Sequence, residues 1–291
     1  MNDISVKALA KINLGLDVVR RREDGYHEVR MVMQTIHLFD RLEISRNDSG
    51  QITMETNLSF LPTNENNLVY KAAKLLQDEF AIKDGVHVWL HKYIPVAAGM
   101  AGGSTDAAAV LYGMNRIFEL GLTKEQLMER GVKIGADVPY CIMRGTALAE
   151  GIGEKLTKLP PMVKCPVLIA KPQISVSTKF VYENLKLNDN TIHPDIDRLV
   201  ADISEGDLTR IAADMGNVLE TVTIPEYPVI AEIKENMMQN GAVNAMMSGS
   251  GPTVFGLFAD ESTAVKAYEA MKESNLAKQV YLTSIYNNAR K

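Results

Sequence analysis

Three glycines, two hydroxyl side chains and a carboxylate lie close together between Ile94 and Ala109, directly ahead of a helical pattern. Glycine lets a backbone approach a ligand closely and adopt positive φ. The free N–H groups and the positive dipole end of a helix N-terminus favour phosphate, and the cluster Ser104, Thr105 and Asp106 is expected to cap the helix. The stretch therefore predicts an anion-binding loop. A close-packed turn without a ligand is the alternative.

Two familiar phosphate motifs do not fit this loop. A P-loop needs a lysine directly after its last glycine, and Gly103 is followed by Ser104. The dinucleotide fingerprint Gly-x-Gly-x-x-Gly is absent as well. The residues indicate a different kind of nucleotide loop.

A lysine and an aspartate in other segments could supply charge and a base. Alternating apolar residues over 4–18 predict a half-buried strand, whose polar face carries Lys11 and Asn13 about 7 Å apart. Both side chains can reach one ligand, and a solvated strand face is the alternative.

Pro139 biases the preceding residue toward extended geometry, so Asp137 is expected between a helix and a strand. A simple turn aspartate is the alternative there.

An aromatic ring and an imidazole follow a turn early in the chain. Asp24-Gly25 is a strong turn signal, and Tyr26 and His27 follow it directly, at the start of a second predicted strand. Such a pair can stack on a planar base and hydrogen-bond to it, although ordinary hairpin packing is equally consistent. His87 and His91 have no partners at metal-ligand spacing and are interpreted as structural or surface residues.

Periodicity and turn signals predict an alternation of strands and helices over the whole chain. Strands are expected near 4–18, 29–39, 51–55, 86–91, 145–149, 167–170, 243–247, 253–258 and 279–284. Helices are expected after the glycine-rich loop, from the segment 175–178, and near 68–80, 123–132, 194–203, 206–218, 226–239 and 261–273, with Asn66 or Asn67 as the cap of the helix over 68–80. Pro160-Pro161 and Cys165-Pro166 break the pattern and predict two domains, 1–162 and 163–291, the second resembling split βαβ units.

Composition excludes several functional classes. The chain has 291 residues, 46% of them hydrophobic and 23% charged, which is typical of a folded globular protein. A net charge of -5 argues against nucleic acid as the main partner. Cys141 and Cys165 are the only cysteines, so neither a disulfide framework nor a zinc site is indicated. No basic-apolar leader or membrane-length apolar run is present, and a cytoplasmic location is expected.

Three separated segments together resemble the signature motifs of the superfamily of galactokinase, homoserine kinase, mevalonate kinase and phosphomevalonate kinase. They are Ala10-Lys11-Ile12-Asn13, the loop 95–106 and the segment 247–255. Within that superfamily, the segments 24–27, 136–140 and 176–178 are similar to the kinases that act on 4-diphosphocytidyl-2-C-methyl-D-erythritol. The resemblance covers essentially the whole chain. One departure is Ala101, which stands where the superfamily usually has a glycine.

The resemblance implies an α+β fold of two domains, with a ribosomal-protein-S5-like N-terminal domain, a ferredoxin-like C-terminal domain and an active site in the cleft between them. It implies transfer of the γ-phosphoryl group of ATP to the 2-hydroxyl of this cytidine diphosphate substrate, giving the 2-phosphate and ADP, in the non-mevalonate isoprenoid pathway. A homoserine- or mevalonate-type kinase and a non-catalytic nucleotide-binding regulator are the alternatives. A monomer or weak homodimer is expected.

The resemblance also implies a role for each candidate residue. Asp137 would accept the proton of the attacking hydroxyl, and Lys11 would hold Asp137 ionised. Asn13 would orient the hydroxyl, Tyr26 and Tyr182 would stack on cytosine, and His27 would read its edge. ATP would lie on the loop residues, with Asn66 near adenine, and Ser104 or Thr105 could assist Mg²⁺. The loop residues are Pro95, Gly99, Met100, Ala101, Gly102, Gly103, Ser104 and Thr105.

Overall fold

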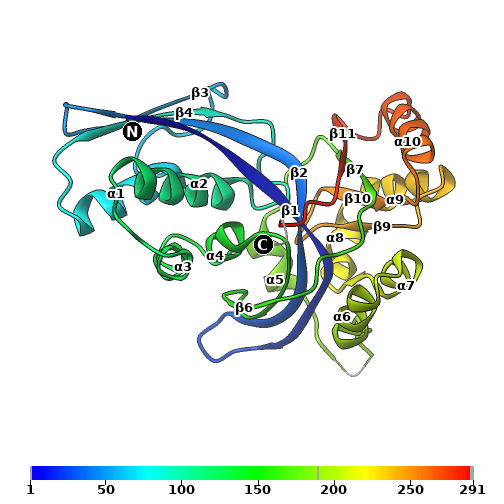
Figure 1. Ribbon diagram of the computed structural model, residues 1–291. Helices are drawn as coiled ribbons and strands as arrows, with labels where there is room; N and C mark the ends of the chain where they lie inside the picture. The colour runs from blue at the N-terminus through cyan, green and yellow to red at the C-terminus, as the bar shows by residue number, and fades with distance from the viewer. Residues whose placement is uncertain (1, 189, 289–291) are drawn as a thin grey trace. The chain divides into compact units, whose positions relative to one another are not determined.

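The computed structural model describes residues 2–188 and 190–288, which form two compact units assembled from separate segments (Figure 1). Within the described residues, one unit takes 2–10, 38–96 and 101–143, and the other takes 11–37, 97–100, 144–188 and 190–288. Two long strands, β1 (Asp3–Arg21) and β2 (His27–Asn47), run through both units. The glycine-rich loop is likewise divided at Ala101, where it enters the helix.

The first unit combines a sheet with four helices, α1 (Leu68–Glu79), α2 (Gly102–Ile117), α3 (Lys124–Val132) and α4 (Val138–Met143). Its strand β4 (Gly85–His91) pairs in parallel with β3 (Ile52–Thr56) and antiparallel with the last third of β2. Helix α2 packs against α1 and α4, and the helices lie on one side of these strands (Figure 1). Their apolar faces form the core of this unit.

The second unit contains an antiparallel sheet in the order β11-β7-β10-β9. Its strands are β7 (Pro166–Lys171), β9 (Asn244–Met247), β10 (Val254–Leu257) and β11 (Gln279–Ser284). Helices α9 (Val229–Gln239) and α10 (Glu261–Glu273) pack on this sheet. The chain order β7-α9-β9-β10-α10-β11 is the ferredoxin-like arrangement. The predicted α+β class is therefore confirmed.

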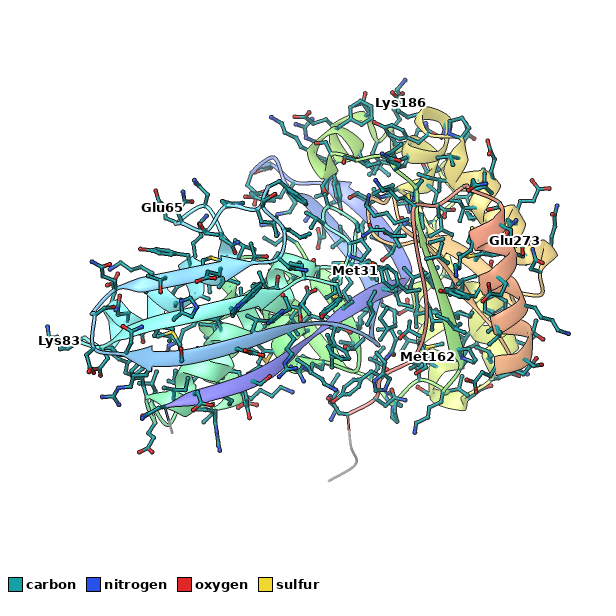
Figure 2. The ribbon with its side chains drawn as sticks, turned by 90° about the horizontal axis from the view of Figure 1, so that it is seen from above. Met31, Glu65, Lys83, Met162, Lys186 and Glu273 are labelled. Atoms are coloured by element: carbon teal, nitrogen blue, oxygen red, sulfur yellow. The ribbon has the colours of Figure 1, made fainter. Side chains whose placement is uncertain are left out.

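The remaining elements of the second unit are short. Strand β5 (Thr146–Gly151) pairs with the first third of β2 and with β6 (Lys155–Lys158). Between β7 and α9 lie α5 (Thr178–Asn184), α6 (Ile196–Glu205), α7 (Leu208–Asp214), β8 (Gly216–Asn217) and α8 (Glu220–Glu226). Figure 2 shows side chains that project to solvent, such as Glu273, and buried ones, such as Met31 and Met162.

Local capping signals placed several helices correctly. Asn67 accepts from the Val69 N–H at the start of α1, and Ser177 accepts from the Phe180 N–H at the start of α5. Thr123 and Gln126 form a complete capping box at α3. These residues satisfy backbone donors that a helix leaves free, which is why they can be recognised from sequence alone.

Two predicted helices are wrong in extent. The predicted helix over 206–218 ends at Asp214, because Gly216 and Asn217 instead pair in parallel with Gly15 and Leu16 of β1. The predicted helix over 226–239 begins only at Val229, and the helix α8 that ends at Glu226 is a separate element that was not predicted from the sequence. Pro228, at the N-cap of α9, has no N–H with which to continue α8.

Two local expectations near the predicted catalytic residues are also corrected. Val138 is not extended, because α4 begins there, and Pro139 occupies its first turn, where a missing N–H costs nothing. Strand β1 is buried on both faces only from Leu9 to Val18, where Lys11 is 5% exposed and Asn13 is 0% exposed, whereas Ser5 and Lys7 are exposed as the alternation predicts. The strand was predicted to be half-buried because alternation alone does not reveal where along a strand its polar side chains become buried.

Candidate active site

Lys11 and Asn13 form one polar group on β1, in the second unit. The Lys11 ammonium donates to the Asn13 side-chain oxygen, and the Asn13 amide lies 3.3 Å from the Met31 sulfur. The Lys11 backbone N–H donates to the Met100 carbonyl at 3.2 Å. Strand β1 and the glycine-rich loop are therefore joined directly at the predicted lysine.

The loop itself reverses direction through residues in the left-handed region. Ala97, Gly99 and Ala101 have φ values of 50°, 69° and 56°. Ala101 adopts the conformation for which a glycine would be less strained. A Cβ on Gly99 would lie 2.0 Å from the Ser248 carbonyl oxygen, so only glycine fits there.

Substituting Gly99 by Ala tests this close approach. Gly121 has nearly the same φ, 70° against 69°, but no atom lies within 4 Å of its Cβ position, so Gly121→Ala is a matched control. We expect Gly121→Ala to cost about 1–2 kcal/mol of unfolding free energy from backbone strain alone. Gly99→Ala should cost roughly 1–3 kcal/mol more because it adds a clash, as measured by urea unfolding. Equal losses would show that the contact with Ser248 is unimportant.

Helix α2 begins without a side-chain cap among the described residues, which corrects the expected capping cluster. Ala101 is the N-cap, and Ser104, Thr105 and Asp106 lie inside the first turns of the helix. The first backbone N–H groups therefore have no acceptor within the helix, which suits an anion. Ser104 is partly exposed, whereas Thr105 is only 1% exposed, so Ser104 is the more accessible hydroxyl.

The segment Ser248–Gly251 forms a tight turn between β9 and β10 and contacts the loop. The Ser248 hydroxyl donates to the Gly99 carbonyl at 2.9 Å. Gly249 and Gly251 have positive φ values of 60° and 86°. The three segments singled out by sequence thus meet in the second unit through Lys11, Met100, Gly99 and Ser248.

Asp137 and Asn66 lie in the first unit. Asp137 is partly exposed at the start of α4, where its carbonyl accepts from the Cys141 N–H at 3.0 Å. Asn66 lies in an exposed turn two residues before Leu68. Leu68 is itself 3.6 Å from the Cβ position of Gly103, so this turn is near the start of α2.

Of the three ring residues predicted to bind cytosine, two contact each other and the third is exposed. His27 and Tyr182 have ring centroids 5.1 Å apart at 39°. Tyr26 is 61% exposed beside them in the chain, and its N–H donates to Asp24 at 3.1 Å. Burial and, secondly, the charge of Arg21 lower the pKa of His27. Its imidazole is therefore neutral at pH 7, able to donate through one nitrogen and accept through the other.

Sequence reasoning missed a buried charge cluster at the start of α2. The Lys92 ammonium contacts the carboxylates of Asp40 and, at 2.8 Å, Asp106. Asp40 also accepts from the backbone N–H groups of Tyr93 and Ile94. Burial lowers the pKa of Lys92, but the two carboxylates outweigh it and the pKa is raised. Asp40 and Lys92 are 52 residues apart, and no local pattern marks such a pair.

Known proteins resemble this chain along its whole length. The family of GHMP kinases N terminal domains matches residues 67–145, and that of GHMP kinases C terminal domains matches 199–277. A protein of Lachnospira eligens called 4-diphosphocytidyl-2-C-methyl-D-erythritol kinase is 58% identical over 98% of this chain and 99% of its own length. The chain belongs to this family of GHMP kinases.

Solved structures agree with this membership. A crystal structure of 4-(cytidine 5'-diphospho)-2C-methyl-D-erythritol kinase matches with a TM-score of 0.85 and 30% identity, covering 98% of this chain and 100% of that one. A homoserine kinase from Cytophaga hutchinsonii matches with a TM-score of 0.82 but 20% identity, over 99% of this chain and 96% of the other. The second match shows a shared fold alone.

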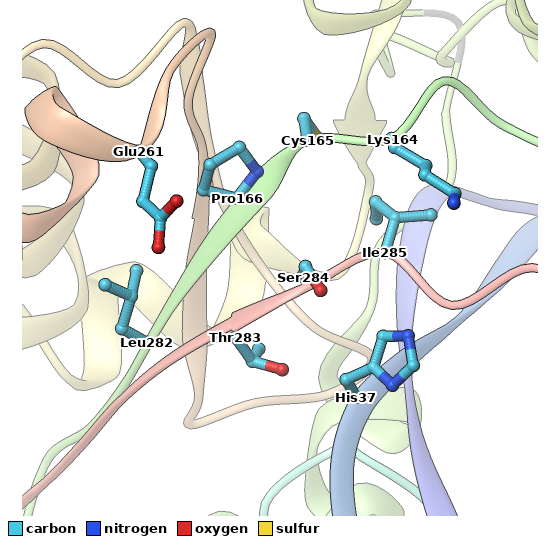
Figure 3. A pocket seen from close by; sticks show the side chains of 9 residues that line it. All are labelled: His37, Lys164, Cys165, Pro166, Glu261, Leu282, Thr283, Ser284 and Ile285. Atoms are coloured by element: carbon cyan, nitrogen blue, oxygen red, sulfur yellow. The ribbon is translucent and has the colours of Figure 1, made fainter.

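A cavity of about 540 Å³ lies in the second unit (Figure 3). Glu261 lies on one side of it and Lys164 and His37 on the other. None of the predicted catalytic, ATP or substrate residues lines it. Burial raises the pKa of Cys165, which does line it, to about 12, so the thiol is protonated and unreactive.

Within residues 2–188 and 190–288, no three His, Cys, Asp or Glu side chains gather to hold a metal ion. In the same part of the chain, each helix is too short or too polar to span a bilayer.

Proposed function

We propose that this GHMP kinase transfers the γ-phosphoryl group of ATP to the 2-hydroxyl of 4-diphosphocytidyl-2-C-methyl-D-erythritol, giving the 2-phosphate and ADP. The structural observation that supports a kinase is the junction of β1, the glycine-rich loop and the Ser248 turn through two hydrogen bonds. The substrate is taken from the names of relatives such as the Lachnospira eligens protein. The product would belong to the non-mevalonate isoprenoid pathway.

Phosphoryl transfer asks the protein mainly for positioning and charge neutralisation. In our proposal Asp137 accepts the proton of the attacking hydroxyl, because it is a partly exposed carboxylate at the start of α4. Lys11 stabilises the negative charge that develops on the acceptor oxygen. Asn13, which is hydrogen-bonded to Lys11, orients that hydroxyl.

The triphosphate would bind the loop residues Gly99 to Thr105 and the free N–H groups of α2. Pro95 leads into this loop and Asn66 contributes near adenine. Mg²⁺ fits this site as a hard cation held largely by phosphate oxygens, with Ser104 as the accessible protein hydroxyl. When bound, the ion would neutralise phosphate charge. Thr105 is too buried to reach a ligand without movement.

Cytosine would be bound by the aromatic residues at 26–27 and 182. Tyr26 offers an exposed ring for stacking, and the His27–Tyr182 pair offers a second face. The neutral His27 imidazole suits a base edge that carries both donors and acceptors. The specificity for a cytidine nucleotide would come from these residues, whereas the loop binds ATP.

Removing the His27 imidazole should affect binding of the cytidine substrate but not binding of ATP. We expect His27→Ala to raise KM for the cytidine substrate about tenfold, the range for losing one stacking partner, with KM for ATP nearly unchanged. His37→Ala is a matched control, since His37 contacts Tyr286 at the same centroid distance of 5.1 Å but belongs to no proposed site. Equal rises in both KM values would mean that the turn is structural.

Acceptor choice tests the proposal against its rivals. ADP release should depend on the cytidylyl methylerythritol substrate, and turnover with homoserine or mevalonate should be negligible. Equal turnover with either would contradict the proposed substrate. A non-catalytic nucleotide-binding regulator would bind ATP and release no ADP with any acceptor.

Three further expectations stay predictions. They are a monomer or weak homodimer, a cytoplasmic location and a domain boundary at 162/163. The matched GHMP segments, 67–145 and 199–277, lie on either side of that boundary, as they would for any boundary between 145 and 199.

A further inference from the structure

Strand β9 lies at one end of its sheet, and two side chains of the segment 217–220 form hydrogen bonds at its outer edge. The Asn217 amide donates to the Met247 carbonyl at 2.9 Å and to the Gly249 carbonyl at 2.8 Å. Glu220 accepts from the Met247 N–H at 2.8 Å. Strand β10 lies on the other side of β9. Asn217 and Glu220 therefore bond both backbone groups of Met247, the last residue of β9, and Asn217 also bonds Gly249 in the turn that follows.

Both side chains are themselves fixed. The Asn217 side-chain oxygen accepts from the Leu219 N–H at 3.0 Å, so its amide orientation is set and all three of these bonds are satisfied together. Asn217 is 7% exposed. The second oxygen of Glu220 pairs with Lys234 at 2.6 Å. A buried, fully bonded side chain such as Asn217 holds its partners rigidly.

The atoms they hold belong to the turn that shapes the glycine-rich loop. Met247 precedes Ser248, whose hydroxyl donates to the Gly99 carbonyl and whose own carbonyl leaves no room for a Cβ on Gly99. The Cβ position of Gly249 is 3.3 Å from the same Gly99 oxygen. A small displacement of the turn would therefore move the loop backbone, and a misplacement of about 1 Å can cost an enzyme 10²-fold.

We propose that Asn217 and Glu220 are positioning residues that hold the Ser248–Gly251 turn against Gly99 and thereby set the shape of the phosphate-binding loop. The inference rests on the proposed function for the role of that loop. Both residues act through the backbone of Met247 and Gly249, not through contact with a ligand.

Asn217→Asp tests the proposal with almost no change in shape. The new carboxylate still accepts from the Leu219 N–H, but it can donate to neither carbonyl and repels both. We expect the affinity for a non-hydrolysable ATP analogue, measured by calorimetry, to fall about tenfold. Hydrogen exchange should speed up in peptides that cover 97–101 and 248–251. Glu220→Ala removes one bond and should give about a threefold loss, which keeps the test open if Asn217→Asp does not fold.

Asn115→Asp is the matched control, because Asn115 also binds backbone groups, those of Leu122, through its amide and its oxygen. It should lose stability without loss of analogue affinity and without faster exchange at 97–101. Identical affinity and exchange in Asn217→Asp and Asn115→Asp would overturn the positioning role. Absence of analogue binding by the unmodified protein would instead overturn the proposed function, and the exchange data would still decide the inference.

Discussion

Replacing Asp137 by Asn is expected to lower kcat about 10²-fold or more, the range for loss of a general base, with little change in either KM. The amide has the shape of the carboxylate but cannot take the proton of the attacking hydroxyl. The start of α4 should be unaffected, because the backbone carbonyl of Asp137, not its side chain, accepts from Cys141. Steady-state kinetics with saturating ATP measures the effect.

A second aspartate-to-asparagine change controls for the loss of charge. Asp207 is the N-cap of α7, where it accepts from the N–H groups of Thr209 and Arg210, and it has no place in the proposed site. Asp207→Asn should leave kcat unchanged. Retention of wild-type kcat in Asp137→Asn would remove Asp137 from the mechanism.

Replacing Lys92 by Met should cause the largest loss of stability, roughly 3–5 kcal/mol, the range for breaking a buried ion pair on one side. The side chains of Asp40 and Lys92 are 0% and 4% exposed, so the change leaves carboxylates without a counter-charge in the interior. Burial already raises the pKa of Asp106 well above its usual value, against the opposing effect of Lys92. Urea unfolding measures the loss.

Two further variants show whether charge or volume is responsible. Lys74 forms an exposed pair with Asp78 at 2.6 Å, and Lys74→Met should change stability only slightly. Adding Asp106→Leu to Lys92→Met removes one of the stranded carboxylates and should recover part of the loss. If the double variant is no more stable than Lys92→Met, the cost comes from packing and not from unpaired charge.

Local chemistry made some parts of this fold predictable. The helix start at Thr123 was predictable, and those at Asn67 and Ser177 were predictable to within one or two residues, because each cap bonds to a backbone group only two or three residues away. Pro139 was misleading, since the same missing N–H that disfavours a helix interior is harmless in the first turn of α4. The sequence pattern alone cannot distinguish these two positions.

Long-range contacts were beyond local reasoning. The end of the predicted helix over 206–218 depends on pairing with β1, some two hundred positions earlier in the chain, as the register Gly15 with Gly216 shows. The roles of Asn217 and Lys92 likewise depend on partners that only the folded chain brings near. The glycine-rich loop and Lys11 were marked by their own residue types, and the resemblance to a kinase superfamily connected them, because it supplies long-range information that periodicity lacks.

The most direct test of the proposed reaction is the ³¹P NMR spectrum of the product formed from ATP and 4-diphosphocytidyl-2-C-methyl-D-erythritol. Carbon 2 of the acceptor carries a methyl group and no hydrogen, so its hydroxyl is tertiary. We predict one new phosphomonoester signal without coupling to a proton on the ester carbon, together with ADP. A monoester signal split by such protons would place the phosphate on another hydroxyl, and the absence of any new monoester would contradict the proposed kinase reaction itself.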